Sequence, residues 1–199
     1  MDRITHLPDR LIEDSGKISR MFLKLGIKSF LAACRYVHEL PYGYNSERDD
    51  LMILFKENMG SCTTKHAVVA TLAEELELPV IKKIGIYAMT EEIVTGADKI
   101  LKKYDFPYIP MVHCFLACRE IRVDLTEGND NGKNRPIDEF LFTESVDANI
   151  SAKDEYLLYR NALKKHVLNR NEFKKASLKD VLHAREEGIA LLRSKVSHT

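Results

Sequence analysis

Cys62, His113 and Asp124 belong to the three residue types that cooperate in thiol-based nucleophilic catalysis, and they occur in this order along the chain. We expect Cys62 at the start of a helix, where the helix dipole and the backbone N–H groups favour a thiolate. A cysteine nucleophile needs an imidazole to take its proton, and the imidazole needs an acceptor to orient it. Because His113 and Asp124 supply these two groups, the three residues together predict a catalytic triad.

A predicted β-hairpin over 111–125 would bring His113 and Asp124 together. Apolar residues alternate along both of its strands: Val112, Cys114, Leu116, Cys118, Ile121, Val123 and Leu125. A two-residue turn at 119–120 places all of them on one face; the predicted pairs are Cys118 with Ile121, Leu116 with Val123, and Cys114 with Leu125. His113 and Asp124 then share the opposite face as diagonal neighbours, with Cα atoms roughly 7–8 Å apart. The alternatives are a surface histidine on a polar strand face and an aspartate that ties down the following turn.

The helix that carries Cys62 is predicted over 62–76, with Ser61 as the N-cap residue whose hydroxyl accepts a backbone N–H. Gly60 would leave room for a substrate to approach the backbone, and Lys65 adds positive charge near the thiol. The alternative for Cys62 is a buried thiol that packs as a small hydrophobic residue.

Apolar spacing and turn residues predict the remaining elements: helices over 17–40, 47–58 and 91–104, a strand over 81–89, and two C-terminal helices within about 151–195. Ser151 and Ser177 are expected to cap the last two helices, since each is followed three residues later by an acid. Residues 126–149 are rich in turn formers and predict a long loop that is mobile or forms a lid. The sequence therefore predicts an α+β fold in a single domain over 1–199.

Composition excludes several classes of protein. The chain has 199 residues, with 30 Lys and Arg against 30 Asp and Glu, so its charge gives no case for a nucleic-acid or anionic membrane partner. No apolar run approaches the ~20 residues that cross a bilayer. The first residues lack the apolar core of a signal peptide, so we expect a cytoplasmic protein whose four cysteines are thiols.

Four short motifs resemble those of the transglutaminase-like superfamily. They are GSCTTKH at 60–66, followed by a helix into ELELPV at 75–80; VH at 112–113; VDLT at 123–126; and LPYGY at 40–44. The resemblance covers roughly residues 30–126, which would form the core of the domain. It implies a papain-like arrangement, in which the cysteine-bearing helix packs on an antiparallel sheet, with extra N- and C-terminal helices outside this core.

The resemblance also implies roles for the triad. Cys62 would be the nucleophile, His113 the general base and then the acid, and Asp124 the orienting residue. The activity would be that of a hydrolase or acyltransferase acting on an amide-type bond through a thioester, with a peptide, protein or small amide as substrate. The chain departs from the family because Thr63 replaces the aromatic residue that often follows the cysteine. It also has no Trp for the acyl tunnel of the crosslinking enzymes. The alternative is an inactive member that serves as a binding or scaffold domain.

Two further questions stay open at this point. An oxyanion hole needs a second donor beside the Cys62 backbone N–H, and Asn45 and Asn58 are both candidates. His66 lies one helical turn from Cys62, but a packed histidine is the expected role because His113 has the better geometry.

Other titratable residues predict no additional site. We expect His38, His166 and His183 to face solvent, and Glu74, Glu75 and Glu77 to form a solvated helix end. Cys114 and Cys118 are four residues apart on a strand, roughly 13 Å at ~3.3 Å per residue. That separation is too large for a disulfide or a shared metal, so we expect neither a metal nor a cofactor.

Overall fold

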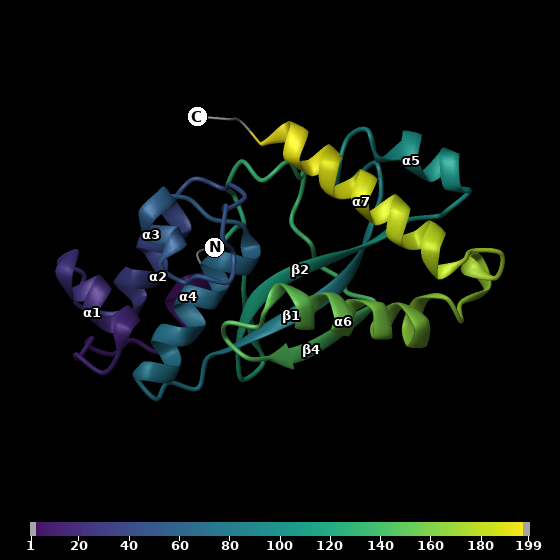
Figure 1. Cartoon of the computed structure of the whole chain (residues 1–199). Helices are drawn as coiled ribbons and strands as arrows, with labels where there is room; N and C mark the ends of the chain where they lie inside the picture. Colours follow the sequence, from purple (N-terminus) through teal and green to yellow (C-terminus); the bar gives the residue numbers. More distant parts are fainter. Residues whose placement is uncertain (1–2, 197–199) are drawn as a thin grey trace. The chain divides into compact units, whose positions relative to one another are not determined.

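The computed structural model describes residues 3–196 and confirms the α+β class, with helices and one four-stranded sheet (Figure 1). The α-helices are α1 (Lys17–Lys24), α2 (Phe30–Glu39), α3 (Ile53–Glu57), α4 (Cys62–Glu75), α5 (Ala97–Tyr104), α6 (Ala152–Ala162) and α7 (Leu178–Lys195). The strands are β1 (Ile81–Met89), β2 (Ile109–Cys118), β3 (Ile121–Val123) and β4 (Phe142–Val146). Short helical turns are η1 (Arg3–His6), η2 (Leu163–Val167) and η3 (Asn171–Phe173).

The predicted hairpin is present as β2 and β3, within a sheet of order β3-β2-β1-β4. The two strands are antiparallel, and their register pairs Leu116 with Val123, Ala117 with Arg122, and Cys118 with Ile121. The turn therefore falls at 119–120 as predicted, with Arg119 in the left-handed region at φ 54°. The expected third pair lies beyond the end of β3 at Val123.

The described residues divide into two compact units, and each unit is assembled from several chain segments. The first unit contains the residues up to Ile84 together with Cys114–Asn129 and Ser145–Ile150. The second contains Gly85–His113, Asp130–Glu144 and the residues from Ser151 onward. No single cut in the sequence separates the units, because each contains segments from several parts of the chain.

The late segment of the first unit is tied to it by a buried lysine. Lys82 is 1% exposed, and its Nζ donates to the backbone oxygen of Ala148 over 3.2 Å. The two residues are 66 positions apart in the sequence. A buried ammonium needs such an acceptor, because an unpaired charge away from water is costly.

In the first unit, α4 is the central helix and contacts α1, α2 and α3. Most of its residues are buried, and they include the polar residues Thr64, Lys65 and His66 beside the apolar ones. The predicted long helix over 17–40 is instead two helices, because Gly26 takes a left-handed conformation at φ 77° between α1 and α2. The core of this unit combines residues of α1, α2, α4, β2 and β3.

Glu75 is not part of a solvated helix end, and that prediction was wrong for this residue. Its carboxylate accepts the backbone N–H groups of Ile18 at 2.9 Å and Ser19 at 2.6 Å. These are N–H groups of the first turn of α1, which have no partner within their own helix. A carboxylate at that position also interacts favourably with the helix dipole, so Glu75 caps α1 from a remote part of the chain.

In the second unit, α5, α6 and α7 surround a separate apolar core. The predicted caps are confirmed, since Ser151 accepts the Asp154 N–H and Ser177 forms a reciprocal capping box with Asp180. Gly85 sits where the Phe140 ring covers β1: a Cβ there would lie 2.2 Å from the ring carbon Cδ1. A glycine in mid-strand marks such a close approach.

The predicted loop over 126–149 contains β4, which the sequence analysis did not anticipate. The strand reads FTESV, and its residues are half-buried or exposed, so it lacks the apolar alternation that reveals a half-buried strand. The helix expected over 91–104 is shorter than predicted and begins at Ala97.

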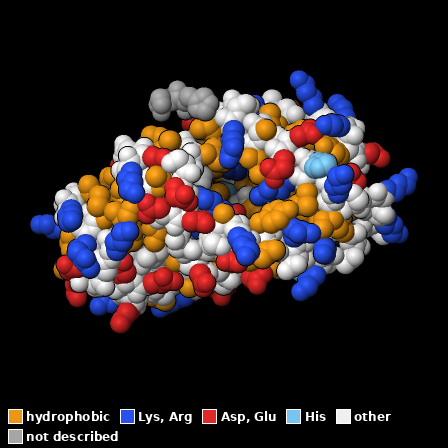
Figure 2. Space-filling view, viewed as in Figure 1, with side chains coloured by type: hydrophobic (Ala, Val, Ile, Leu, Met, Phe, Trp, Pro, Cys, Tyr) orange, Lys and Arg blue, Asp and Glu red, His pale blue; other side chains and the backbone are white. Residues whose placement is uncertain are grey.

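The described part of the chain contains no helix that is both long and apolar enough to cross a membrane. Figure 2 shows Lys and Arg side chains interspersed with Asp and Glu over the visible face. This mixture agrees with the equal numbers of basic and acidic residues in the sequence.

Candidate functional site

Cys62 is the first residue of α4, as predicted, and it is buried, with 8% of its surface exposed. Ser61 has the extended backbone of an N-cap residue, but within the described residues its hydroxyl accepts no hydrogen bond from the first turn. The expected role of Gly60 was wrong: a Cβ there would lie 2.5 Å from Leu54 Cδ1. The space beside Gly60 is therefore filled by a core side chain and is not open to a substrate.

The four cysteines are all buried thiols and form no disulfide in the structure. Cys34 lies in α2, and Cys114 and Cys118 lie in β2, where both pack in the interior as the hairpin pattern predicted. Cys62 is the cysteine of the four that stands at a helix N-terminus.

His113 lies in β2 and is buried, with 2% of its surface exposed. The alternative of a surface histidine was therefore wrong. Within the second unit, the Tyr87 ring meets the imidazole edge-on, with centroids 6.4 Å apart at 85°. An aromatic edge contact of this kind restricts the orientation of the imidazole.

Asp124 follows β3 directly and is 17% exposed at its side chain. Its Oδ1 accepts the backbone N–H and the hydroxyl of Thr126, both at 2.8 Å. The alternative role of Asp124, that of fixing the turn after the strand, is therefore present in the structure. Cys62 and Asp124 belong to the first unit and His113 to the second.

The first turns of α4 contact the hairpin through residues that adjoin the predicted triad. Thr63, next to Cys62, has its Oγ1 3.7 Å from the Sγ of Cys114. His66 is fully buried, and its Nε2 accepts the backbone N–H of Leu125 at 2.8 Å. Since Cys114 follows His113 and Leu125 follows Asp124, the neighbours of all three predicted residues take part in these contacts.

His66 connects Cys62 to Asp124. Because Nε2 accepts a backbone N–H, the ring proton must be on Nδ1, which donates to the Cys62 carbonyl oxygen at 2.6 Å. The Asp124 Oδ1 lies 3.5 Å from Nε2. In this tautomer the imidazole is neutral, so that approach is not an ion pair. The expectation that His66 is a packed histidine is confirmed, and both of its ring nitrogens bond backbone groups.

Lys65 is fully buried, and its ammonium points toward the C-terminal end of α2. Burial lowers the pKa of Lys65 from 10.5 to about 8, and the nearby Asp124 carboxylate partly opposes this decrease. His38, expected to face solvent, is half-buried, and its Nδ1 lies 3.1 Å from the Leu125 carbonyl oxygen. These side chains form a buried polar network, here called the α4 network: His38, Lys65, His66, Asp124 and Asn129.

The two candidates for the second oxyanion donor have other roles. The Asn45 side-chain Nδ2 donates to Glu57 at 2.8 Å and to the Met59 carbonyl oxygen at 3.0 Å, so both of its N–H bonds are used. Asn58 ends α3 in the left-handed conformation at φ 51°, which Asn tolerates better than most residues. Asn45 therefore has no side-chain donor left for an oxyanion hole.

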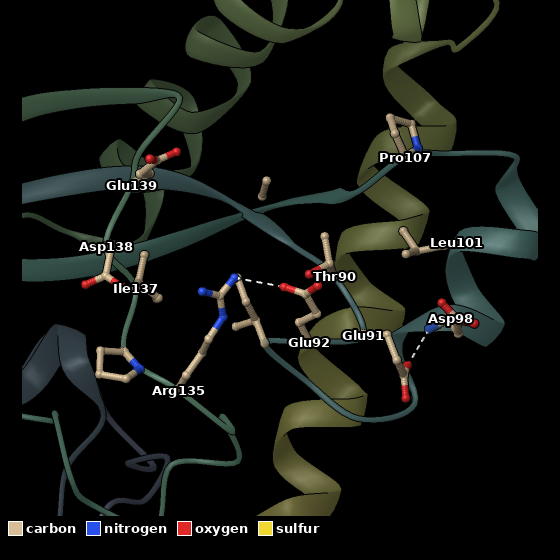
Figure 3. A pocket seen from close by; sticks show the side chains of 13 residues that line it. Thr90, Glu91, Glu92, Asp98, Leu101, Pro107, Arg135, Ile137, Asp138 and Glu139 are labelled. Atoms are coloured by element: carbon tan, nitrogen blue, oxygen red, sulfur yellow. Dashed lines mark hydrogen bonds and ion pairs between the residues drawn. The ribbon is translucent and has the colours of Figure 1, made fainter.

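The second unit contains a cavity of about 630 Å³ with acidic walls (Figure 3). Many of its charges have partners: Glu91 accepts the N–H groups of Gly96 and Asp98, and Glu92 pairs with Arg135 at 3.1 Å. In Figure 3 the Arg135 guanidinium points toward the Glu92 carboxylate. Among residues 3–196, no group of three or more His, Cys, Asp or Glu residues could hold a metal ion.

Asn129 and the backbone of α2 were not singled out by the sequence analysis, although both belong to the buried surroundings of Lys65. Asn129 is 64 residues from Lys65 and 91 from His38. It lies in a run of turn residues, and no local spacing pattern indicates partners at such distances.

Compared with known proteins, the chain matches no protein-family model, no curated protein and no solved structure. The transglutaminase-like resemblance therefore stays a prediction that depends on the motif residues alone.

Proposed function

We propose that this protein is a cysteine-dependent hydrolase or acyltransferase that acts on an amide-type bond. Cys62 would be the nucleophile, His113 the general base and then the acid, and Asp124 the residue that orients the imidazole. The fold would be a papain-like, transglutaminase-like core with α4 as its cysteine-bearing helix. The substrate class is a peptide, a protein or a small amide.

One observation supports this proposal more than any other: the start of α4 contacts the hairpin at the residues next to His113 and Asp124. Thr63 approaches Cys114 at 3.7 Å, and His66 accepts the Leu125 N–H at 2.8 Å. The confirmed register of β2 and β3 adds to this, because the prediction that His113 and Asp124 are diagonal neighbours on one face depends on that register.

The proposed reaction has two steps. His113 takes the thiol proton of Cys62, and the thiolate attacks the carbonyl carbon while the carbonyl oxygen gains negative charge near the helix N-terminus. The C–N bond then breaks, the imidazolium protonates the leaving amine, and a thioester remains. Water or a second amine attacks the thioester with His113 again as base, which releases the acid or the new amide and restores the thiol.

A second function, that of a binding or scaffold domain with this fold, is favoured by two different observations. Both N–H bonds of Asn45 are engaged by Glu57 and Met59, so this residue supplies no oxyanion donor. Cys62 is also 8% exposed, close to the 5% of the core residue Cys118. A thiol that serves only for packing needs neither an oxyanion hole nor access for a substrate.

The rate of Cys62 alkylation by iodoacetamide as a function of pH distinguishes the two functions. The proposed triad predicts a thiolate midpoint well below the ~8.5 of an ordinary thiol, and a shift toward that value in His113→Ala. Peptide mapping separates Cys62 from Cys34, which serves as the internal control because it is fully buried in α2. A Cys62 that reacts no faster than Cys34, with a midpoint unchanged by His113→Ala, would refute the catalytic proposal and favour the scaffold.

A further inference from the structure

Lys65 is completely buried, and its ammonium has an acceptor for each of its three N–H bonds. Nζ donates to the His38 carbonyl oxygen at 3.2 Å, to the Leu40 carbonyl oxygen at 2.5 Å and to Asn129 Oδ1 at 2.5 Å. The first two acceptors lie at the C-terminal end of α2, where carbonyl groups have no partner within the helix. A cation is favoured at that end of a helix by the dipole.

The third acceptor belongs to a different chain segment, residues 125–129. Asn129 also donates its side-chain Nδ2 to the His38 carbonyl oxygen at 2.9 Å, so one amide bonds both Lys65 and α2. At the other end of the segment, His38 Nδ1 lies 3.1 Å from the Leu125 carbonyl oxygen, which can only accept a hydrogen bond. Both ends of the segment are therefore attached to the end of α2.

Asp124 immediately precedes this segment and is joined to it by its side chain. Its Oδ1 accepts both Thr126 donors at 2.8 Å, and its carbonyl oxygen accepts the Glu127 N–H at 3.3 Å. The Asn129 N–H bonds the Thr126 carbonyl oxygen at 3.2 Å. A continuous series of hydrogen bonds thus runs from the Lys65 ammonium through Asn129 and Thr126 to the Asp124 carboxylate.

We propose that Lys65 is a positioning residue for Asp124: its buried ammonium holds the segment 125–129 against α2 and thereby fixes the Asp124 carboxylate. This inference rests on the proposed function, because the position of Asp124 matters for reactivity only if it orients His113. The ammonium acts through Asn129 and the turn and does not touch the reacting atoms.

The experiment compares Lys65→Met with Lys82→Met. Both substitutions remove a buried ammonium from the first unit, but Lys82 bonds Ala148 and has no bond to the segment 125–129. Backbone hydrogen exchange of the segment is measured by mass spectrometry on the full chain. We expect Lys65→Met to raise its exchange rate by about tenfold or more, as for a lost hydrogen bond to a charged group. Lys82→Met should leave that rate unchanged relative to the wild type.

The second readout is the pH midpoint for alkylation of Cys62, which a general loss of stability does not move. We expect Lys65→Met to shift this midpoint toward the value found for Asp124→Asn, while Lys82→Met keeps that of the wild type. If Lys65→Met does not fold, Asn129→Ala provides the same test, because it removes the side chain that joins Lys65 to the segment.

The outcomes separate the two proposals. Equal exchange of 125–129 in Lys65→Met and Lys82→Met would overturn the positioning role. A second outcome is faster exchange of 125–129 in Lys65→Met, while the pH midpoint for Cys62 alkylation is the same in the wild type, Lys65→Met and Asp124→Asn. This outcome would support the proposal that Lys65 fixes the segment. The same combination would refute the proposed function, because Asp124 would then have no influence on the thiol.

Discussion

Two regions of the molecule hold several charged or polar side chains close together, and they differ in how much water reaches them. In the α4 network of the first unit, Lys65 and His66 are fully buried and bond mainly backbone groups. Around the cavity of the second unit, Arg135 and Glu92 are 52% and 79% exposed at their side chains and bond each other.

This difference in exposure indicates which of the two regions can hold reactive groups in a fixed geometry. Buried polar groups lose water, so each must find a partner in the protein, and its position is then narrowly determined. Exposed ion pairs exchange protein partners for water at little cost, so the same side chains can adopt other conformations. The α4 network therefore suits a site that needs preorganised groups, which is what the proposed triad requires.

The largest expected effect is on the pH dependence of stability. The folded pKa of Lys65 is lowered to about 8, whereas the unfolded value stays near 10.5. Between these pH values the unfolded chain binds one proton more, so the free energy of unfolding rises with pH, by on the order of 3 kcal/mol across this window. Chemical denaturation of the wild type and Lys65→Met over this range measures it. If the difference in the free energy of unfolding between the two proteins does not change with pH, Lys65 has the same pKa in the folded and unfolded states, and the prediction is wrong.

A somewhat smaller effect is expected for His66→Leu. This change removes the partners of the Cys62 carbonyl oxygen and of the Leu125 N–H, both of which lie in the interior. We expect a loss of about 2–3 kcal/mol in the free energy of unfolding, the cost of leaving buried polar groups unsatisfied. The matched control is His183→Leu on α7, at an exposed position, which should change stability by less than about 0.5 kcal/mol. A similar loss in the free energy of unfolding in both variants would contradict the view that buried polar groups are held more tightly than exposed ones.

Glu75 is intermediate in exposure between the buried α4 network and the exposed ion pair at the cavity. It is half-buried and accepts two N–H groups at the start of α1. Glu75→Ala should cost about 1 kcal/mol, the typical value of a helix cap. Hydrogen exchange at 18–19 should rise in the same variant, since these amides lose their acceptor. Its exposed neighbour gives the control, and Glu74→Ala is expected to leave α1 unaffected.

The smallest effect is expected at the cavity of the second unit. Arg135→Ala removes the ion pair with Glu92, whose two side chains are largely exposed. The free energy of unfolding should fall by less than about 1 kcal/mol, and the remaining difference should shrink at high salt. A loss as large as that of His66→Leu would mean that the cavity wall is as rigid as the α4 network.

Local patterns in the sequence were sufficient to predict much of the fold. The limits of β1 agree with the predicted strand, and the caps of α6 and α7 were recognisable from Ser151 and Ser177. The hairpin register followed from the alternation of apolar residues, because a slip by one position would have turned the apolar face outward. In each case the partners lie within a few residues of each other or within one hairpin.

Partners distant in the sequence could not be predicted in this way. Glu75 accepts the Ile18 N–H across 57 residues, and Lys65 bonds Asn129 across 64 residues. The polar strand β4 was missed because its residues pack little apolar surface, although its backbone pairs in the sheet. For the candidate site, the sequence indicated that Cys62 begins a helix, but not that His66 bonds its carbonyl group.

The bond between Lys82 and Ala148 has a consequence for synthesis on the ribosome. The ammonium of Lys82 emerges from the exit tunnel long before its acceptor, and residues 85–113 and 130–144, which belong to the other unit, are translated in between. Folding from the N-terminus domain by domain is the usual order during synthesis. Here the nascent first unit stays incomplete until residue 150 has been added. Two segments of the second unit, 85–113 and 130–144, are therefore translated before the first unit can finish folding.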